Sequence, residues 1–521
     1  MSHPGTQHGV AAEAPRMSHS GTQHGVAAEA PRTSHPGTQH GVAAEAPRMS
    51  HPGTQHGVAA EAPRVSHSGT QHGVAVEAPR MSHPGMQHCL AAVRRTELMQ
   101  RLGRVSQFFG LVVESVGPDA FVGEMCEIHS RGHETPVVAE VLGLKDGKVL
   151  LMPYDELKGV SLGSRVIATG KAAYTPVGEA LLGRVVDAFG APLDGSPITE
   201  PLLQYPLRPT PINPLERARV RDVLETGVRS IDCLFTLGRG QRVGIFAGSG
   251  VGKSTLLGMI ARNMNADVNV IALVGERGRE VRDFVEETLG PEGLKRSVVV
   301  AATSDQPALV RIRAAHAATA IAEYFRAQGL HVVLTMDSVT RYAMAQREIG
   351  LSIGEPPTAR GYTPSVFAAL PRLLERGGIH ESGGSLTAIY TVLVEGDDLN
   401  DPISDAVRAT LDGHISLSRA LANRGQFPAI DSLNSVSRLI RQLVPEDDLA
   451  TVKQVLKSLS VYHASRDLID VGAYRAGVNA ELDQAVRWSP HLDRFLAQAP
   501  GAAVARSQAM QQLRALLARE R

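Results

Sequence analysis

The chain has 521 residues, which at about 150 residues per domain corresponds to roughly three or four structural units. Hydrophobic residues make up 43% of the sequence, enough to form buried cores in most of these units. Lysine plus arginine (53) equals aspartate plus glutamate (53), so no field of one sign can attract nucleic acid or anionic lipid. Aromatic residues are only 4% of the chain, too few for the stacking surfaces of proteins that bind single strands.

Cysteine usage and hydropathy indicate the cellular compartment in which the protein is expected. Cys89, Cys126 and Cys233 are odd in number and widely spaced, which fits neither a disulfide framework nor a zinc site. The first ten residues, MSHPGTQHGV, contain no apolar signal-peptide core, and no later stretch reaches the roughly 18 apolar residues of a membrane span. We therefore expect a soluble protein of a reducing compartment, the cytoplasm.

The N-terminal region is repetitive. Residues 1–80 are five near-identical copies of a 16-residue unit, and a sixth copy decays from Met81 onward. Each copy contains glycine and proline, and its only apolar residues are valine and alanine, so stacked copies would bury little against the entropy of ordering them. We expect residues 1–95 to be a disordered tail. Twelve of the 20 histidines lie here in H-x4-H pairs such as His3 and His8, which leaves metal binding as the alternative.

The rest of the chain divides into three predicted domains. Five apolar runs between residues 104 and 172, the first of them the single run FGLVVESVG, predict a small barrel or sandwich. Residues 176–440 alternate strand runs with helical periodicity, which is typical of a mostly parallel α/β domain. Residues 441–521 have a helical pattern, in which one face of a helix carries Leu449, Val452, Val455, Leu456 and Leu459.

Residues 247–254, AGSGVGKS, match the phosphate-binding loop of P-loop enzymes, with Ala247 in place of the usual first glycine. Glycines at 248, 250 and 252 allow backbone N–H groups to converge on a phosphate at the start of the next helix, where the helix dipole is positive. Lys253 can reach the β- and γ-phosphates, and the Ser254 hydroxyl can ligate Mg²⁺. A plain glycine-rich turn is the alternative, but the loop lies between a strand and a helix whose inward face carries Leu256, Leu257 and Ile260, as the motif requires.

Two carboxylates follow later strands. Asp337 ends the strand LHVVLTMD, where a carboxylate would support a metal ion and its water shell, although buried strands often end in aspartate. Glu276 ends the strand VNVIALVG and is a candidate for polarising an attacking water; the alternative is the solvated start of a charged helix. For Glu280, on that helix, we favour the solvated position.

With these motifs in order, the chain resembles the catalytic-subunit superfamily of rotary ATPases and, within it, the ATPases of type III protein export. The resemblance extends from about residue 105 to residue 498 and rests on AGSGVGKSTLLGMI, VGERGREV, FPAIDSLNSVSR and VGAYRAGVNAELDQAV, among other segments. It implies an α/β fold class: a RecA-like P-loop core with a small six-stranded N-terminal β-barrel and a C-terminal helical domain, assembled as a ring of six with ATP sites between neighbours.

The resemblance also assigns roles to residues. It implies that Glu276 activates water, that Arg277 lines the site, and that Asp337 and Ser254 support Mg²⁺. Arg438 matches the arginine finger that the next subunit supplies. By periodicity alone, it would be a surface residue on an amphipathic helix with Leu439, Ile440 and Leu443. The ATP-binding set that the resemblance implies comprises Ala247, Gly248, Ser249, Gly250, Val251, Gly252, Lys253, Ser254, Thr255 and the adenine-packing Phe427.

The resemblance finally implies a function and partners. SDQPALVRIRAAH and GYTPSVFAALPRLLERGG are more similar to the flagellar branch, which predicts a flagellar protein export ATPase; the virulence injectisome ATPase is the alternative. Expected partners are a stator or regulator protein, a central-stalk coiled coil, export chaperones and cargo, at the inner face of the cytoplasmic membrane. Neutral charge opposes a RecA-core nucleic-acid translocase, and Glu276 with Arg438 opposes a subunit that only binds nucleotide.

Overall fold

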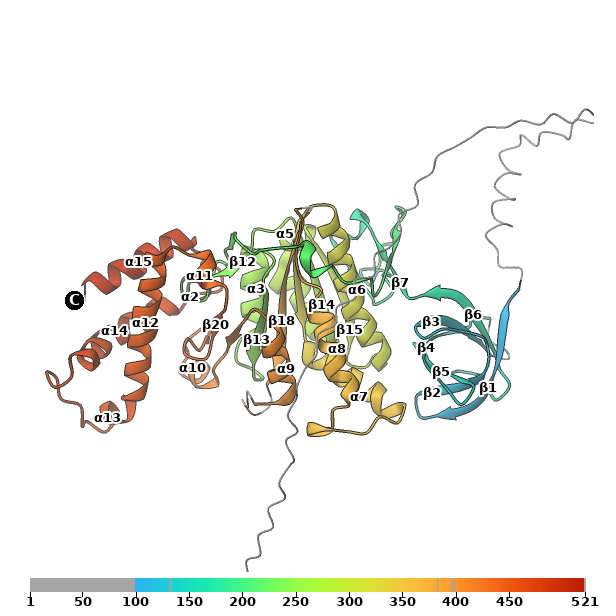
Figure 1. Cartoon of the computed structure of the whole chain (residues 1–521). Coiled ribbons are helices and arrows are strands. Elements are labelled where there is room, and N and C mark those ends of the chain that lie inside the picture. The colour runs from blue at the N-terminus through green and yellow to red at the C-terminus, as the bar shows by residue number, and fades with distance from the viewer. Residues whose placement is uncertain are drawn as a thin grey trace, which may run out of the picture. The chain divides into compact units, whose positions relative to one another are not determined.

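The structure is a computed structural model that describes residues 99–519, apart from residues 131, 133, 382, 395, 397 and 399. The tail predicted for residues 1–95 lies outside the described residues. Along the chain, the described part forms a β-barrel, an α/β domain and a set of C-terminal helices, which confirms the predicted fold class (Figure 1). No helix in this part is both long and apolar enough to cross a membrane.

The N-terminal domain is a closed barrel with the strand order β1-β2-β5-β4-β3-β6. Its strands are β1 (Arg101–Phe109), β2 (Val112–Val116), β3 (Glu124–His129), β4 (Val137–Lys145), β5 (Lys148–Pro153) and β6 (Arg165–Ala172). The expectation of five runs that begin with one strand across FGLVVESVG was wrong. Gly110 takes a φ of +58°, which glycine adopts readily, so the chain turns there and β2 pairs back onto β1.

Short elements connect the barrel to the central sheet. They are β7 (Tyr174–Val177), β8 (Arg184–Val186), β9 (Leu203–Pro206), β10 (Arg217–Ala218), β11 (Val223–Leu224), α2 (Arg229–Leu234) and β12 (Leu237–Gly238). β7 pairs with β9 and β11 with β12 in two small antiparallel sheets.

The central sheet has the order β20-β19-β13-β18-β16-β14-β15-β8, with β17 and β10 attached beside β18. Its further strands are β13 (Arg242–Ala247), β14 (Val268–Glu276), β15 (Ser297–Thr303), β16 (His331–Asp337), β17 (Gly378–His380), β18 (Ser385–Leu393), β19 (Gly413–Ser416) and β20 (Val436–Ser437). The strands from β19 to β8 are parallel, so their carboxyl ends meet at one edge of the sheet.

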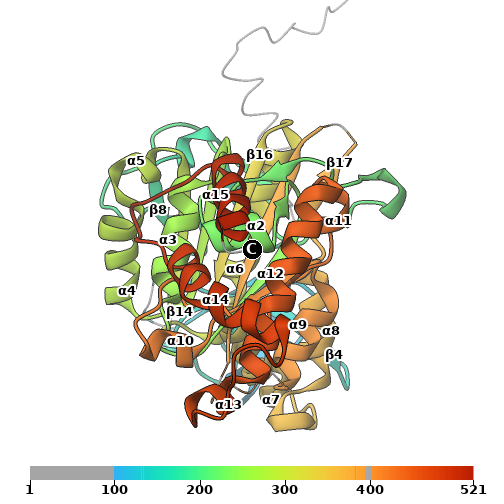
Figure 2. The same ribbon diagram turned by 90° about the vertical axis from the view of Figure 1, so that its left-hand side faces the viewer.

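Helices cover both faces of this sheet, and each face has its own buried cluster of apolar side chains (Figures 1 and 2). One face packs against α6 (Ala308–Ala327), α7 (Val339–Ser352), α8 (Pro364–Leu374) and α9 (Pro402–Thr410). The other packs against α2, α3 (Lys253–Asn263) and the C-terminal helices. Further helices are α4 (Gly278–Asp283), α5 (Gly290–Lys295), α10 (Arg419–Asn423) and α11 (Ile440–Leu443), with the short elements η1 (Glu179–Leu181), η2 (Pro214–Glu216), η3 (Phe284–Leu289) and η4 (Ala359–Gly361).

The C-terminal helices are α12 (Glu446–Ala464), α13 (Arg466–Asp470), α14 (Ala480–Leu496) and α15 (Arg506–Arg519). Leu449, Val452 and Val455 on α12 are buried, as their helical spacing predicts. Asp448 accepts hydrogen bonds from Arg506 and Arg514, and Arg506 also donates to the carbonyl of Asp232 on α2. This network ties the last helix to both α12 and the central domain.

A buried arginine joins α6 to the segments that follow the barrel. Arg313 is 5% exposed, and its guanidinium lies 4.5 Å from the ring centre of Phe189 and 5.4 Å from that of Tyr154, just after β5. It also donates to the carbonyl oxygens of Ala188 (3.2 Å) and Tyr174 (2.6 Å). Desolvated cation–π contacts and charged hydrogen bonds are each worth about 1–3 kcal/mol, so this side chain is a main connection of the junction.

Replacing Arg313 should therefore destabilise the folded chain. Arg313→Ala removes both ring contacts and leaves the buried carbonyl of Ala188 and the carbonyl of Tyr174 without this donor, so we expect a loss of roughly 2–4 kcal/mol. The midpoint of urea unfolding, followed by circular dichroism, measures the change. Arg279→Ala, at an arginine whose side chain is 84% exposed, is the matched control. Equal midpoints for the two variants would contradict this role of Arg313.

Candidate phosphate-binding and catalytic site

The phosphate loop connects the carboxyl end of β13 to the first residue of α3. Gly250 and Gly252 have φ values of +76° and +91°, a conformation that residues with side chains rarely adopt. No side chain caps the start of α3, and no acidic residue lies in its first turn. The N–H groups of this turn and the positive end of the helix dipole therefore form a site suited to an anion.

The flanks of the loop are fixed by burial. Ala247 and Val251 are each 1% exposed, whereas Ser254 and Thr255 lie exposed at the start of α3. Leu256, Leu257 and Ile260 are buried, as the sequence predicts for the inward face of this helix. The loop is consequently held by apolar anchors on both sides and presents its hydroxyl groups outward.

Three charged side chains meet beside the loop. The Lys253 ammonium group contacts the Asp337 carboxylate, and its Nζ lies 3.8 Å from Oε1 of Glu276. β14 and β16 are parallel neighbours, and Leu273 pairs with Asp337, so their ends place Glu276 and Asp337 on the same edge of the sheet. The structure thus brings together three of the residues that the sequence singled out, from three separate segments.

Asp337 is held in position by a neighbouring strand. Its Oδ1 accepts a hydrogen bond of 2.7 Å from the hydroxyl of Thr391 on β18, and the residue is 5% exposed. The position of the carboxylate therefore does not depend on Lys253 alone.

Glu276 has a perturbed acidity. Burial raises its pKa from the ordinary value of 4.5 to about 7, the negative charge of Asp337 adds to the rise, and the charge of Lys253 opposes it. Its Oε1 is buried and has no hydrogen-bond partner among the described residues. A hydrogen bond with the Glu280 side chain adds to the rise in pKa. A carboxylate with a pKa near neutrality and one unpartnered oxygen is suited to accept a proton.

Arg277 lies outside this cluster, whereas Glu280 lies at its edge and interacts with Glu276. The side chain of Arg277 is 79% exposed at the start of α4, and its Nη1 lies 3.8 Å from Oε1 of Glu280. Glu280 is exposed, as expected for a solvated helix start. The structure does not bring Arg277 to Lys253 within the chain.

Arg438 lies at the opposite end of the strands from the phosphate loop. Its backbone N–H donates to Asp412, which is level with Arg242 at the start of β13, so about five residues, or roughly 16 Å of strand, separate it from Ala247. Its side chain is exposed and donates to the carbonyl of Arg408. The alternative of one amphipathic helix through Leu439 was wrong, because Val436–Ser437 form β20 and α11 begins only at Ile440.

Phe427 lies against the phosphate loop. A Cβ atom on Gly252 would be 3.4 Å from its ring, and the residue is 45% exposed. Its carbonyl oxygen accepts a hydrogen bond of 2.8 Å from the backbone N–H of Gln498, in the segment between α14 and α15. The buried side chain of Gln498 also accepts from Arg229 N–H (2.9 Å) and donates to the carbonyls of Gly227 (2.7 Å) and Ala502 (2.5 Å).

The sequence analysis did not identify Gln498 or two further arginines at the site. Arg419 donates to the carbonyl of Ser249 in the phosphate loop (3.0 Å), and the side chain of Arg341 packs where a Cβ on Gly275 would lie. Gly275 precedes Glu276, so Arg341 borders the carboxylate cluster. Arg341 follows Asp337 by four residues, and this spacing after a strand end was the available signal.

The pKa of Glu276 predicts a pH-dependent change in stability. Between about pH 4.5 and 7 the Glu276 carboxyl is protonated in the folded chain but ionised in the unfolded chain. The folded state therefore loses stability as the pH rises through this range, and the loss is complete above pH 7. Glu276→Gln removes that loss. We expect the variant to be roughly 2–3 kcal/mol more stable at pH 8, and the gain to shrink as the pH falls toward 5.

Urea unfolding across this pH range, in buffer without nucleotide or Mg²⁺, measures the gain. Glu287→Gln, at an exposed glutamate, should show no such slope. A gain for Glu276→Gln that is independent of pH would contradict the raised pKa.

Gln498 should affect nucleotide affinity through Phe427. Gln498→Leu keeps the side-chain size but loses three buried hydrogen bonds, so the backbone that holds Phe427 is loosened while Lys253, Glu276 and Asp337 stay in place. We expect the dissociation constant for a fluorescent adenine nucleotide to rise about three- to tenfold. Gln512→Leu, at an exposed glutamine on α15, is the control. An unchanged affinity in a folded Gln498→Leu protein would contradict the coupling.

Comparison with known proteins agrees with this geometry. Residues 227–437 match the nucleotide-binding domain of the ATP synthase alpha/beta family, residues 105–170 match its beta-barrel domain, and residues 444–515 match the T3SS EscN ATPase C-terminal domain. The flagellum-specific ATP synthase of Bacillus subtilis is 55% identical over 407 residues, which are 78% of this chain and 93% of that protein.

Two further relatives come from type III secretion. The type 3 secretion system ATPase of Xanthomonas euvesicatoria is 50% identical over 399 residues, 77% of this chain and 90% of that protein. The structure of assembled EscN with its central stalk EscO, from enteropathogenic E. coli, has a TM-score of 0.73 at 41% identity and covers 80% of this chain and 100% of EscN. The chain therefore belongs to the ATP synthase alpha/beta family, among the ATPases of flagellar and type III export.

Proposed function

We propose that this chain is the flagellar protein export ATPase, which hydrolyses Mg·ATP in sites shared between the subunits of a homohexameric ring and thereby unfolds or releases export cargo and its chaperones. One observation carries the proposal. Lys253, Glu276 and Asp337 converge beside the uncapped start of α3. These groups can bind a triphosphate, support a metal ion and activate a water molecule.

The charge of each group in the site determines its proposed role in hydrolysis. The amides of the loop and the first turn of α3 bind phosphate oxygens, and the Lys253 ammonium group neutralises charge on the β- and γ-phosphates. A bound triphosphate competes with Asp337 for this ammonium group. Glu276, with its pKa raised to about 7, orients the attacking water and accepts its proton.

The residues present fit Mg²⁺. Ser254 offers a hydroxyl oxygen and Asp337 a carboxylate oxygen, which are the hard ligands that this ion prefers. The described residues contain no cluster of three or more histidine, cysteine, aspartate or glutamate side chains that could hold a metal alone. Mg²⁺ usually binds through one or two protein groups together with substrate phosphates, and when bound it would neutralise developing charge on them.

The remaining positions complete the nucleotide site. Gly252 and Phe427 lie in contact, so a base bound beside the loop can stack on the exposed ring of Phe427. Thr255 lies next to Ser254 at the start of α3 and is proposed to contact a phosphate. Arg277, exposed in the single chain, is proposed to line the site once a neighbouring subunit is present.

Arg438 is proposed as the arginine finger of the neighbouring subunit. It cannot serve the phosphate loop of its own chain, because the length of β13 separates the two. Its exposed position at the edge strand β20 is compatible with reaching across a subunit boundary. A cation delivered in this way typically contributes about 10³–10⁵ in rate.

The proposed partners follow from the relatives. EscN assembles with a central stalk, which supports a ring and a coiled-coil stalk for this chain. A stator or regulator protein, export chaperones and cargo are proposed further partners, with the ring peripheral to the membrane export gate and no specific nucleic acid bound. Virulence injectisome export is the second candidate, because a type 3 secretion ATPase is 50% identical, compared with 55% for the flagellar relative. A RecA-core nucleic-acid translocase remains remote.

The shared site predicts complementation between inactive variants. Lys253→Ala and Arg438→Ala should each abolish most ATP hydrolysis, because one lacks the phosphate-binding cation and the other lacks the finger. Mixed in equal amounts, the two proteins should regain measurable hydrolysis, because some interfaces then pair an intact loop with an intact arginine. Phosphate release at matched total protein concentration measures the recovery.

Arg441→Ala, at an exposed arginine three residues further on, should keep wild-type activity and serves as the control. Full activity in a demonstrably monomeric preparation, or an unimpaired Arg438→Ala enzyme, would refute the shared site. Wild-type turnover of a folded Lys253→Ala protein would refute the assignment of the phosphate loop.

A further inference from the structure

A cavity lies where the barrel, the segment around Arg208 and helices α6, α7 and α8 meet. Its volume is about 630 Å³, within the range of small-molecule sites, and none of its lining residues belongs to the phosphate loop or the carboxylate cluster. Its walls are largely apolar, formed by Val141, Leu142, Leu309, Ile312, Ile349, Ala368 and Ala369. The proposed ATPase activity makes no use of this cavity.

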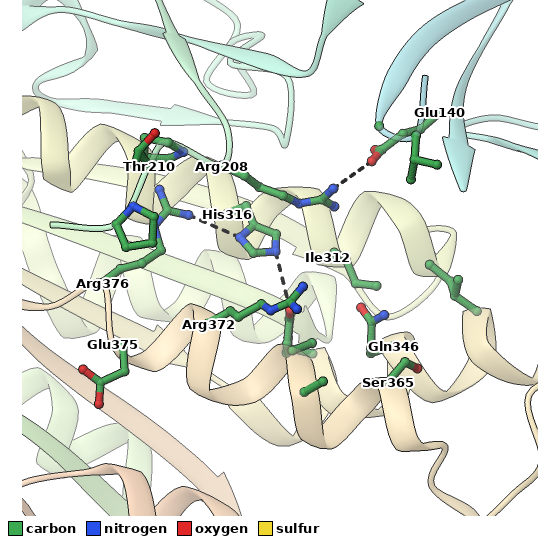
Figure 3. A pocket seen from close by; sticks show the side chains of 18 of the residues that line it. Glu140, Arg208, Thr210, Ile312, His316, Gln346, Ser365, Arg372, Glu375 and Arg376 are labelled. Carbon is green, nitrogen blue, oxygen red and sulfur yellow. Dashed lines mark hydrogen bonds and ion pairs between the residues drawn. The ribbon is translucent and has the colours of Figure 1, made fainter. Parts of the chain in front are cut away.

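Several charged groups of the cavity gather around one histidine. Arg208, Arg372 and Arg376 surround His316, as Figure 3 shows. His316 is 7% exposed, and burial together with the charges of Arg208 and Arg376 lowers its pKa well below the ordinary value, so it is neutral. Its ring lies 3.3 Å from Arg376 Nη1 and 3.5 Å from the hydroxyl of Tyr342.

Most of the arginine charge is compensated within the protein. Arg376 donates two hydrogen bonds to the carboxylate of Glu323 (2.9 and 2.6 Å), and Arg208 donates one to Glu140 (2.9 Å). The Arg372 side chain, at an exposed position of α8, has no hydrogen-bond or ion-pair partner in the described part of the chain. Four arginines and three glutamates line the whole cavity, and Glu375 is also paired with Arg242 outside it, so the lining has an excess of positive charge, and Arg372 is the lining arginine without an acidic partner.

We propose that this cavity is a ligand site for a small organic anion with an apolar body, separate from the nucleotide site. The apolar walls bury the body, and the guanidinium of Arg372 binds the carboxylate or sulfonate group. A guanidinium presents paired donors that match the two oxygens of such a group. A neutral ligand would leave the Arg372 guanidinium without an anionic partner.

A ligand bound in this cavity would contact two domains at once. The lining of the cavity comes from the barrel (Val122, Gly123, Glu140–Leu142) and from the central domain, so a bound ligand contacts both. α7, which contributes Tyr342, Gln346 and Ile349, begins two residues after Asp337. A ligand held here therefore contacts the helix that follows the metal-supporting aspartate.

Binding of 8-anilinonaphthalene-1-sulfonate tests the proposal, because this probe combines aromatic rings with one sulfonate and fluoresces when buried. The full chain is titrated with the probe in saturating Mg·ADP, which occupies the nucleotide site. We expect Arg372→Ala to weaken the binding that saturates with wild type about tenfold or more. Ala369→Phe, which fills the cavity, should abolish that binding, and Arg441→Ala, outside the cavity, should leave it unchanged. Decanoate should displace the probe, whereas decanol should not.

Three results would overturn the proposal. Binding that is equal in wild type, Arg372→Ala and Ala369→Phe would place the probe elsewhere. Binding lost in Ala369→Phe but kept in Arg372→Ala, or displacement by decanol as effective as by decanoate, would refute an anion site. Circular dichroism of each variant checks folding, and none of the altered residues belongs to the proposed catalytic machinery, so these outcomes are independent of the proposed function.

Discussion

The contact of one lysine with two carboxylates organises the site. Lys253 contacts Asp337 and lies 3.8 Å from Glu276, and this ammonium group is the positive charge nearest to both. Burial of Glu276 beside Asp337 would be costlier without it, and the pKa of Glu276 still rises to about 7. A phosphate that draws Lys253 away would leave the two carboxylates to a metal ion and a water molecule. The same three side chains can therefore form an ion-paired cluster without nucleotide and take part in hydrolysis when a triphosphate is bound.

The parallel sheet makes this convergence possible. β13, β14 and β16 end at one edge, so residues 253, 276 and 337, far apart in sequence, are placed together by strand register alone. The opposite end of β13 holds Arg438 through Asp412, which keeps the proposed finger away from its own loop. The C-terminal helices reach the site only through Gln498 and Phe427 among the contacts described above.

The sequence predicted the parts of the site that local patterns encode. Contiguous residues encode the phosphate loop and the strand ends at Glu276 and Asp337. Helical periodicity encodes the inward face of α3. Strand β18 (Ser385–Leu393) was not predicted, although its run SLTAIYTVL is buried along most of its length. The roles of Gln498 and Arg313 could not be predicted from the sequence. Apart from Ala502, their partners lie 71 to 271 positions away, so only the tertiary fold reveals them.

The most direct test is the structure of the assembled chain with Mg²⁺ and a non-hydrolysable ATP analogue. We expect Lys253 to leave Asp337 and contact the phosphates, and Ser254 and Asp337 to lie on the metal side. We expect Glu276 to face the γ-phosphate and Arg438 of the neighbouring subunit to approach it. A nucleotide bound with Lys253 still on Asp337, or a γ-phosphate contacted by no arginine of a neighbouring subunit, would contradict the account.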